Sequence, residues 1–112
     1  MHELSITRNI VAIVVEAANG RRVRRVTVEI GTLSGVMADA VRFCFDLVAE
    51  GTVVQGAALE IVEPAGRARC CACAGEFDIA TLWTGCACGS RDLVHLHGEE
   101  LTVKSFECEE AA

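Results

Sequence analysis

Apolar residues recur at helical spacing in the first part of the chain. Between residues 3 and 18 they form a broad face opposite charged and amide side chains. Its members are Leu4, Ile10, Val11, Ile13, Val14 and Val15. Spacings of three and four indicate an amphipathic helix, and the Asn19-Gly20 pair that follows is typical of a helix end. We therefore expect a helix over residues 3–18.

Three further stretches carry a clear period. Residues 21–30 alternate between apolar and polar side chains, which predicts a half-buried strand. Residues 41–48 place apolar side chains at positions i, i+3, i+4 and i+7, which predicts a second amphipathic helix ended by Gly51. Residues 58–63, ALEIVE, read as a second strand that closes at Pro64 and Gly66.

The chain returns to strand character at its end. Residues 100–107, ELTVKSFE, predict a third strand with Leu101 and Val103 on one face. We expect an α+β fold: a small three-stranded sheet with two helices, formed by residues 1–66 and 98–112. Residues 67–97 are then an insertion before the last strand, and an insertion of this size needs a metal ion or a disulfide to hold it together.

Charge and composition exclude several classes of protein. The 112 residues carry 16 acids against 10 bases, a net charge of −6, without the basic patch that binding to nucleic acid or to a membrane surface needs. No apolar stretch approaches the length of a membrane span, and the first 20 residues lack the pattern of a signal peptide. The seven cysteines are an odd number. A metal site in a reducing compartment explains them better than a disulfide framework.

Two close cysteine pairs stand out in the insertion. Cys70 and Cys73 form a C-x2-C pair, and Cys86 and Cys88 form a C-x-C pair after a loop. Two pairs separated by a loop suit a tetrahedral ion, because each turn supplies two thiolates. Four thiolates without an open position favour structural zinc. A rubredoxin-like iron site has the same ligands, and disulfides are the other alternative.

Several residues of the insertion have secondary interpretations. Cys71 is a reserve zinc ligand and otherwise a spare surface thiol. Phe77, Leu82 and Trp83 are expected to form a small apolar cap. His95 and His97 share one side of an extended segment; they are candidates for a second ion, although a solvent-facing or hydrogen-bonded pair is the commoner arrangement.

The pieces together resemble the HypA/HybF family of nickel metallochaperones for [NiFe]-hydrogenase maturation. The resemblance rests on the opening MHE, on GTLSGVMADAVRFCFDLV, on LEIVE, on the paired cysteines with CGS, and on the final GEELTVKSFE. It covers nearly the whole chain in the same order, and the C-x-C pair departs from the family pattern. The resemblance implies a nickel-binding domain with an inserted zinc domain and cytoplasmic work with a HypB-type nickel GTPase. It also implies delivery of nickel to the hydrogenase large subunit.

The family's nickel residue matches His2, and Glu3 matches its adjacent acid. A histidine in second position lets one ion bind the Met1 amine, the His2 amide nitrogen and the imidazole, with a further donor from Glu3. Ni(II) accepts such a planar set of nitrogen and oxygen donors. Because the amine and amide must lose protons, affinity is expected to rise with pH.

Two other functions stay open at this point. The first is a zinc-ribbon adaptor for protein interaction that does not bind nickel. It would differ from a nickel metallochaperone chiefly in the role of His2, which would then bind no metal. Nickel delivery to urease is the other alternative. No Ser-His-Asp grouping or phosphate-binding glycine loop is present, so we do not expect an enzyme. We expect a monomer or a weak homodimer.

Overall fold

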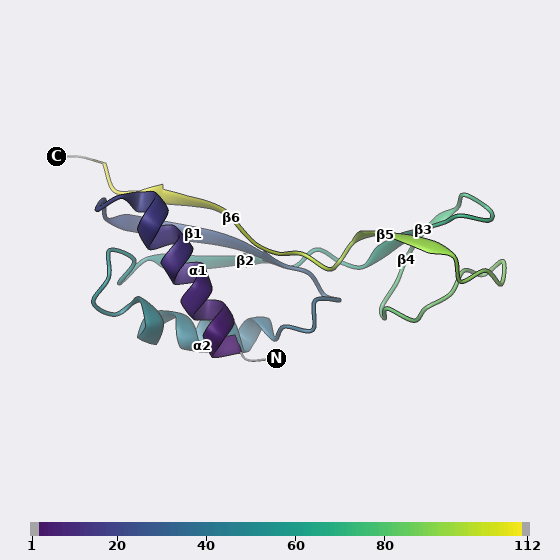
Figure 1. The fold of residues 1–112 in the computed structure, drawn as a ribbon, viewed down its shortest axis with the longest axis horizontal. Helices are drawn as coiled ribbons and strands as arrows, with labels where there is room; N and C mark the ends of the chain where they lie inside the picture. The colour runs from purple at the N-terminus through teal and green to yellow at the C-terminus, as the bar shows by residue number, and fades with distance from the viewer. Residues whose placement is uncertain (1–2, 111–112) are drawn as a thin grey trace.

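The computed structural model describes residues 3–110 as an elongated molecule with two three-stranded sheets (Figure 1). The elements are α1 (Glu3–Ala18), β1 (Val23–Ile30), α2 (Ala38–Ala49), β2 (Ala58–Val62), β3 (Arg67–Cys70), β4 (Glu76–Asp78), β5 (Leu93–His97) and β6 (Leu101–Cys108). The radius of gyration is 17.3 Å, against about 13–14 Å for a compact chain of this length. We call the helices with β2, β1 and β6 the helical lobe, and the other sheet with its loops the cysteine lobe.

The sheet of the helical lobe has the order β2-β1-β6. Strands β1 and β2 are parallel, because α2 carries the chain back across the sheet between them, and β6 is antiparallel to β1. Both helices cover the same face of this sheet (Figure 1). The α+β fold, with a last strand that returns to the first sheet, is confirmed.

The main core lies between the helices and this sheet. Its fully buried side chains include Val14 of α1, Val26 and Val28 of β1, and Val41 and Phe45 of α2. The apolar stripes predicted for the two helices therefore supply the core together with the alternating side chains of β1.

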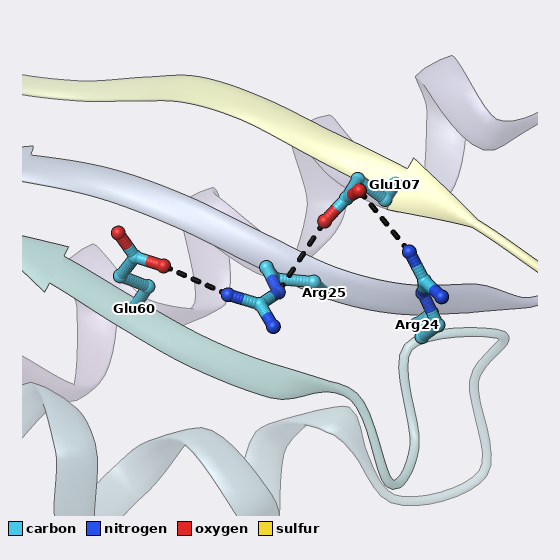
Figure 2. Close-up of polar contacts among 4 residues, drawn as sticks. All are labelled: Arg24, Arg25, Glu60 and Glu107. Atoms are coloured by element: carbon cyan, nitrogen blue, oxygen red, sulfur yellow. Dashed lines mark hydrogen bonds and ion pairs between the residues drawn. The ribbon is translucent and has the colours of Figure 1, made fainter.

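The opposite face of the sheet is polar and carries a chain of ion pairs (Figure 2). Arg25 lies between Glu60 of β2, at 3.0 Å, and Glu107 of β6, at 3.3 Å; Arg24 adds a contact to Glu107 at 3.1 Å. These side chains are about half exposed, so each pair is worth at most about 1 kcal/mol. The network joins all three strands on the face that the helices leave open.

The predicted apolar faces of α1 and β6 each include side chains that are exposed in the structure. In α1, Leu4 and Ile13 are exposed, whereas Thr7 is buried and its hydroxyl donates to the Glu3 carbonyl. In β6, Leu101 at the start of the strand is 38% exposed, whereas Val103, two residues on, packs against the core. Leu101 and Val103 keep the predicted common face, because the register shift near Lys104 comes after both of them, and both line a groove beside α1.

The cysteine lobe has its own sheet, with the antiparallel order β4-β3-β5. A small apolar cluster on it consists of Ala68 and Ile79 with Leu33, which comes from the loop after β1. Phe77 packs against this cluster as expected, but Leu82 and Trp83 are 47% and 74% exposed. The predicted cap was wrong for these two residues, because Leu33 of the helical lobe fills that role.

Three glycines meet where the two lobes join. A Cβ atom on Gly31 would lie 2.0 Å from the Gly98 carbonyl oxygen, and one on Gly66 would lie 2.3 Å from the Ile79 carbonyl oxygen. Gly98 has a φ of +116° and its Cβ would lie 2.7 Å from the Gly66 Cα. No side chain fits at these positions, so the backbones of the two lobes pass each other in direct contact.

Backbone hydrogen bonds fix the same junction. The N–H groups of Gly31, Thr32 and Leu33 donate to the carbonyls of Glu100, Pro64 and Gly98, at 2.8, 3.0 and 2.7 Å. Residues 31–33 thus lie between the segment that leaves the first sheet and the segment that returns to it. Neither helix described in residues 3–110 has the length and hydrophobicity of a bilayer-crossing segment.

Candidate metal centre

Four cysteines lie together in the turn after β3 and the loop before β5. These two segments form the end of the molecule that is far from the helices (Figure 1). Cys70 ends β3 and Cys73 lies in the following turn, where the N–H of Ala74 donates to the Cys70 carbonyl at 2.9 Å. Cys86 and Cys88 lie in the loop before β5. There the N–H of Gly89, whose φ is +97°, donates to the Cys86 carbonyl at 2.9 Å. Each pair is therefore carried by a tight turn.

The sulfur positions form a compact group. The Sγ atoms of Cys70 and Cys88 are 3.7 Å apart, as are those of Cys73 and Cys86, and all four lie within 4.8 Å of one another. A tetrahedral zinc ion with Zn–S bonds of about 2.3 Å separates its sulfurs by about 3.8 Å. The geometry therefore fits a four-thiolate zinc site. The C-x-C pair meets this requirement because each of its sulfurs lies opposite one sulfur of the first pair.

The four thiols have unequal acidities. The backbone N–H of Cys73 lowers the pKa of the Cys70 thiol to about 6, helped by further hydrogen bonds from Ala72 and the neighbouring thiols. For Cys86 the N–H of Cys88 acts in the same direction, but hydrogen bonds with the surrounding thiols and burial outweigh it and raise the pKa to about 12. The first proton leaves the group easily and a later one does not, so a cation is needed for all four sulfurs to become thiolates.

Cys71 does not belong to the group. It is exposed, and its backbone N–H donates to the Asp92 carbonyl at 2.9 Å. Partial burial of the sulfur and the nearby Asp92 carboxylate raise the pKa of the Cys71 thiol. A protonated thiol outside the cluster matches the interpretation of Cys71 as a spare residue.

The remaining two cysteines lie in the helical lobe. Cys44 of α2 and Cys108, at the end of β6, are half-buried free thiols. Cys108 packs against the main core and belongs to the sheet, although its acidic sequence surroundings suggest a tail.

The two histidines of β5 face carboxylates. His95 Nδ1 lies 3.5 Å from a Glu99 oxygen, and His97 Nδ1 lies 3.9 Å from a Glu100 oxygen. Among residues 3–110, only the four cysteines bring three or more potential ligand atoms this close together. The structure does not bring His95 and His97 to the cysteine cluster.

The predicted nickel residues lie at the start of the chain. Met1 and His2 lie outside the described residues. The Glu3 carboxylate accepts a hydrogen bond at 3.1 Å from the N–H of Met37, which precedes α2. Glu3 thus links the start of α1 to the start of α2, a contact that local sequence patterns did not reveal. Asp39, in the first turn of α2, pairs with Arg42 of the same helix.

Comparison with known proteins gives consistent matches over the full length. The family model described as "Hydrogenase/urease nickel incorporation, metallochaperone, hypA" matches residues 1–108. The hydrogenase maturation factor HypA of Trichormus variabilis is 53% identical over 110 residues, covering 98% of this chain and 97% of the relative. That of Geobacter sulfurreducens is 46% identical over 110 residues, covering 97% of this chain and 100% of the relative. The solution structure of the Ni metallochaperone HypA from Helicobacter pylori superposes with a TM-score of 0.68 at 29% identity, covering 96% and 97% of the two chains.

Proposed function

The chain belongs to the HypA family of nickel metallochaperones for hydrogenase maturation, and we propose that it divides its work between two metal sites. As a member of this family it is not an enzyme. In our proposal the start of the chain carries the nickel ion that is delivered, and the cysteine lobe holds a permanent zinc ion. We propose residues 1–66 and 98–112 as the nickel domain and residues 67–97 as the zinc domain.

Nickel is bound at the N-terminus by the Met1 amine, the His2 amide and imidazole, and a donor of Glu3. The observation that carries this proposal is the contact between the Glu3 carboxylate and the Met37 N–H. This hydrogen bond fixes the first turn of α1 against the start of α2, and the proposed nickel donors directly precede that turn in the sequence. Because the Glu3 carboxylate accepts a hydrogen bond from the Met37 N–H, the backbone amide nitrogen of Glu3 is the better fourth donor for planar Ni(II).

Calorimetry with Ni(II) on untagged chain tests this assignment. We expect His2→Ala to remove the binding of one nickel ion, and acetylation of the terminal amine to do the same. His97→Ala is the control, since His97 is an exposed histidine beside a carboxylate in the cysteine lobe. Unchanged nickel binding after acetylation would refute an N-terminal site.

Zinc is held by Cys70, Cys73, Cys86 and Cys88, with Cys71 outside the set. Two sulfur separations of 3.7 Å and a spread of at most 4.8 Å among all four sulfurs support this ligand set. Cys88→Ser is expected to lower bound zinc strongly, whereas Cys71→Ser keeps one equivalent. Metal analysis of the purified variants measures both, and it also distinguishes zinc from iron.

The partners follow from the resemblance and stay part of the proposal. We propose that the chain works in the cytoplasm with a HypB-type nickel GTPase and hands nickel to the hydrogenase large subunit, as a monomer or weak homodimer. The matching family description names both hydrogenase and urease, whereas the curated relatives cited above are named for hydrogenase maturation. Pull-down with nickel-loaded chain, followed by identification of the retained client, separates the two deliveries.

A further inference from the structure

The single tryptophan of the chain lies on the surface of the cysteine lobe. Trp83 is 74% exposed and its neighbour Leu82 is 47% exposed, in the loop between β4 and β5. Tryptophan is a costly residue to leave in water, and it is enriched among the residues that dominate protein–protein binding. The zinc site does not require it, since neither side chain packs in the apolar cluster of the lobe.

Local hydrogen bonds hold this loop in place. The hydroxyls of Thr81 and Thr84 are 2.7 Å apart, and the guanidinium of Arg91 donates to the Trp83 carbonyl at 2.8 Å. The exposed ring is therefore presented by an ordered turn that spans the loop. A preformed surface of this kind loses little entropy when a partner binds.

A hollow of about 320 Å³ lies beside the ring. Leu82, Trp83 and Leu93 form apolar walls, and Arg91, with Thr84 and His95, provides hydrogen-bond donors. The volume suits one or two side chains of a partner, rather than a whole helix.

Arg91 is the arginine that lines this hollow. Two carboxylates of the lobe, Glu76 and Asp78, pair with Arg67, and His95 faces Glu99. Within residues 3–110, Arg91 has no carboxylate within 4.0 Å. One side of its guanidinium is committed to the Trp83 carbonyl, and the remaining N–H groups can bind a carboxylate.

We propose that this hollow is a docking site for a protein segment that presents an apolar side chain next to a carboxylate. The apolar side chain packs against Trp83 and Leu93, and the carboxylate binds Arg91. The site lies in the cysteine lobe and uses none of the proposed nickel donors. It therefore adds a contact surface to the proposed function without depending on it.

Three capped hexapeptides test the chemistry directly, with the emission of Trp83 as the signal. One contains two leucines and two aspartates, one has lysines in place of the aspartates, and one has serines in place of the leucines. We expect a saturable blue shift with the leucine–aspartate peptide only, with a Kd of about 1 mM for so short a ligand. Equal responses to all three peptides, or no response up to about 10 mM, would overturn the proposal.

Variants of the zinc-loaded full chain identify the residue that binds the carboxylate. Arg91→Ala is expected to weaken the peptide about tenfold or more, and Arg91→Lys by a smaller factor because it keeps the charge but loses the planar fork. Arg69→Ala is the matched control: Arg69 is an exposed arginine of the same lobe that makes no ion pair within the described residues. Equal affinity of Arg91→Ala and Arg69→Ala would refute the role of Arg91.

A second copy of the chain is the other occupant that these measurements can reveal. If Trp83 emission shifts with protein concentration alone, and sedimentation shows a dimer that Trp83→Ala abolishes, the hollow serves self-association and the proposal is wrong. Zinc content and circular dichroism of every variant check that the lobe is intact. Normal nickel binding by these variants keeps the result independent of the N-terminal site.

Discussion

The glycine junction between the lobes allows a quantitative prediction for Gly98→Ala. The added Cβ would lie 2.7 Å from the Gly66 Cα, 2.9 Å from Leu33 Cδ1 and 3.1 Å from the Gly66 nitrogen. Two of these atoms belong to the backbone and cannot rotate away, so crowding costs about 1–3 kcal/mol. The φ of +116° adds about 1–2 kcal/mol, because alanine disfavours that region.

Gly20→Ala separates the two contributions. Gly20 also has a positive φ, +85°, but a Cβ atom at this position would have no neighbour within 4 Å, so only the backbone cost applies. For a chain of this length 1 kcal/mol corresponds to about 4 °C in Tm. We therefore expect Gly98→Ala to melt about 4–12 °C below Gly20→Ala, as followed by circular dichroism for the helices and by Trp83 fluorescence for the cysteine lobe. Equal melting temperatures of the two variants would refute the crowding at the junction.

Three further outcomes follow from the packing and electrostatics. Phe45 is 2% exposed, so Phe45→Ala is expected to lower the free energy of unfolding by about 3–5 kcal/mol, as measured by denaturant unfolding. Phe43 is 78% exposed, so Phe43→Ala is expected to change it by no more than about 0.5 kcal/mol. A similar loss for both variants would contradict the assigned core. Glu107→Gln removes two ion pairs, with Arg24 and Arg25, on a half-exposed surface. The free energy of unfolding is therefore expected to fall by less than about 1 kcal/mol, and the difference from the unchanged protein to disappear in about 1 M salt. A difference that persists in salt would contradict an electrostatic role for Glu107. Zinc affinity is expected to rise with pH across the neutral range, because the raised pKa of Cys86, about 12, leaves a proton that zinc must displace, whereas Cys70, with its pKa lowered to about 6, adds such a proton only below that pH. Competition with a chelator between about pH 6 and 8 measures the slope, and a zinc affinity that does not change with pH would contradict the raised pKa of Cys86.

The sequence predicted the helical lobe well because its elements carry regular periods. Helix α1 has the expected bounds, and α2 and β2 lie within a few residues of the predicted ranges. Strand β1 begins at Val23 rather than at residue 21, since Arg21 and Arg22 are two polar residues in succession and stand before the alternating part of the segment. The return of the last strand to this sheet was predicted, but neither its pairing with β1 nor the bulge near Lys104 has a signal in the local pattern.

The cysteine lobe was less predictable. Strands β3 and β4 have four and three residues, too few for a period to be recognised. The position of Leu33 in the second apolar cluster depends on a contact across the junction, which no local pattern reveals. The same holds for the Glu3 carboxylate, whose acceptor role appears only when α1 and α2 are packed. By contrast, the four clustered cysteines could be selected from their spacing, because the requirement for paired thiolates is local.

The strands that enter and leave the cysteine lobe cross at one narrow point, where residues 31–33 bond to Pro64 on one side and to Gly98 and Glu100 on the other. A segment whose ends are neighbours can be lengthened, shortened or exchanged without moving the sheet that hosts it. Evolution can therefore remodel the sulfur-bearing tip while the helices and their sheet keep their shape. Gly66 and Gly98 limit such exchange, since any replacement segment must be flanked by glycine at both of these positions.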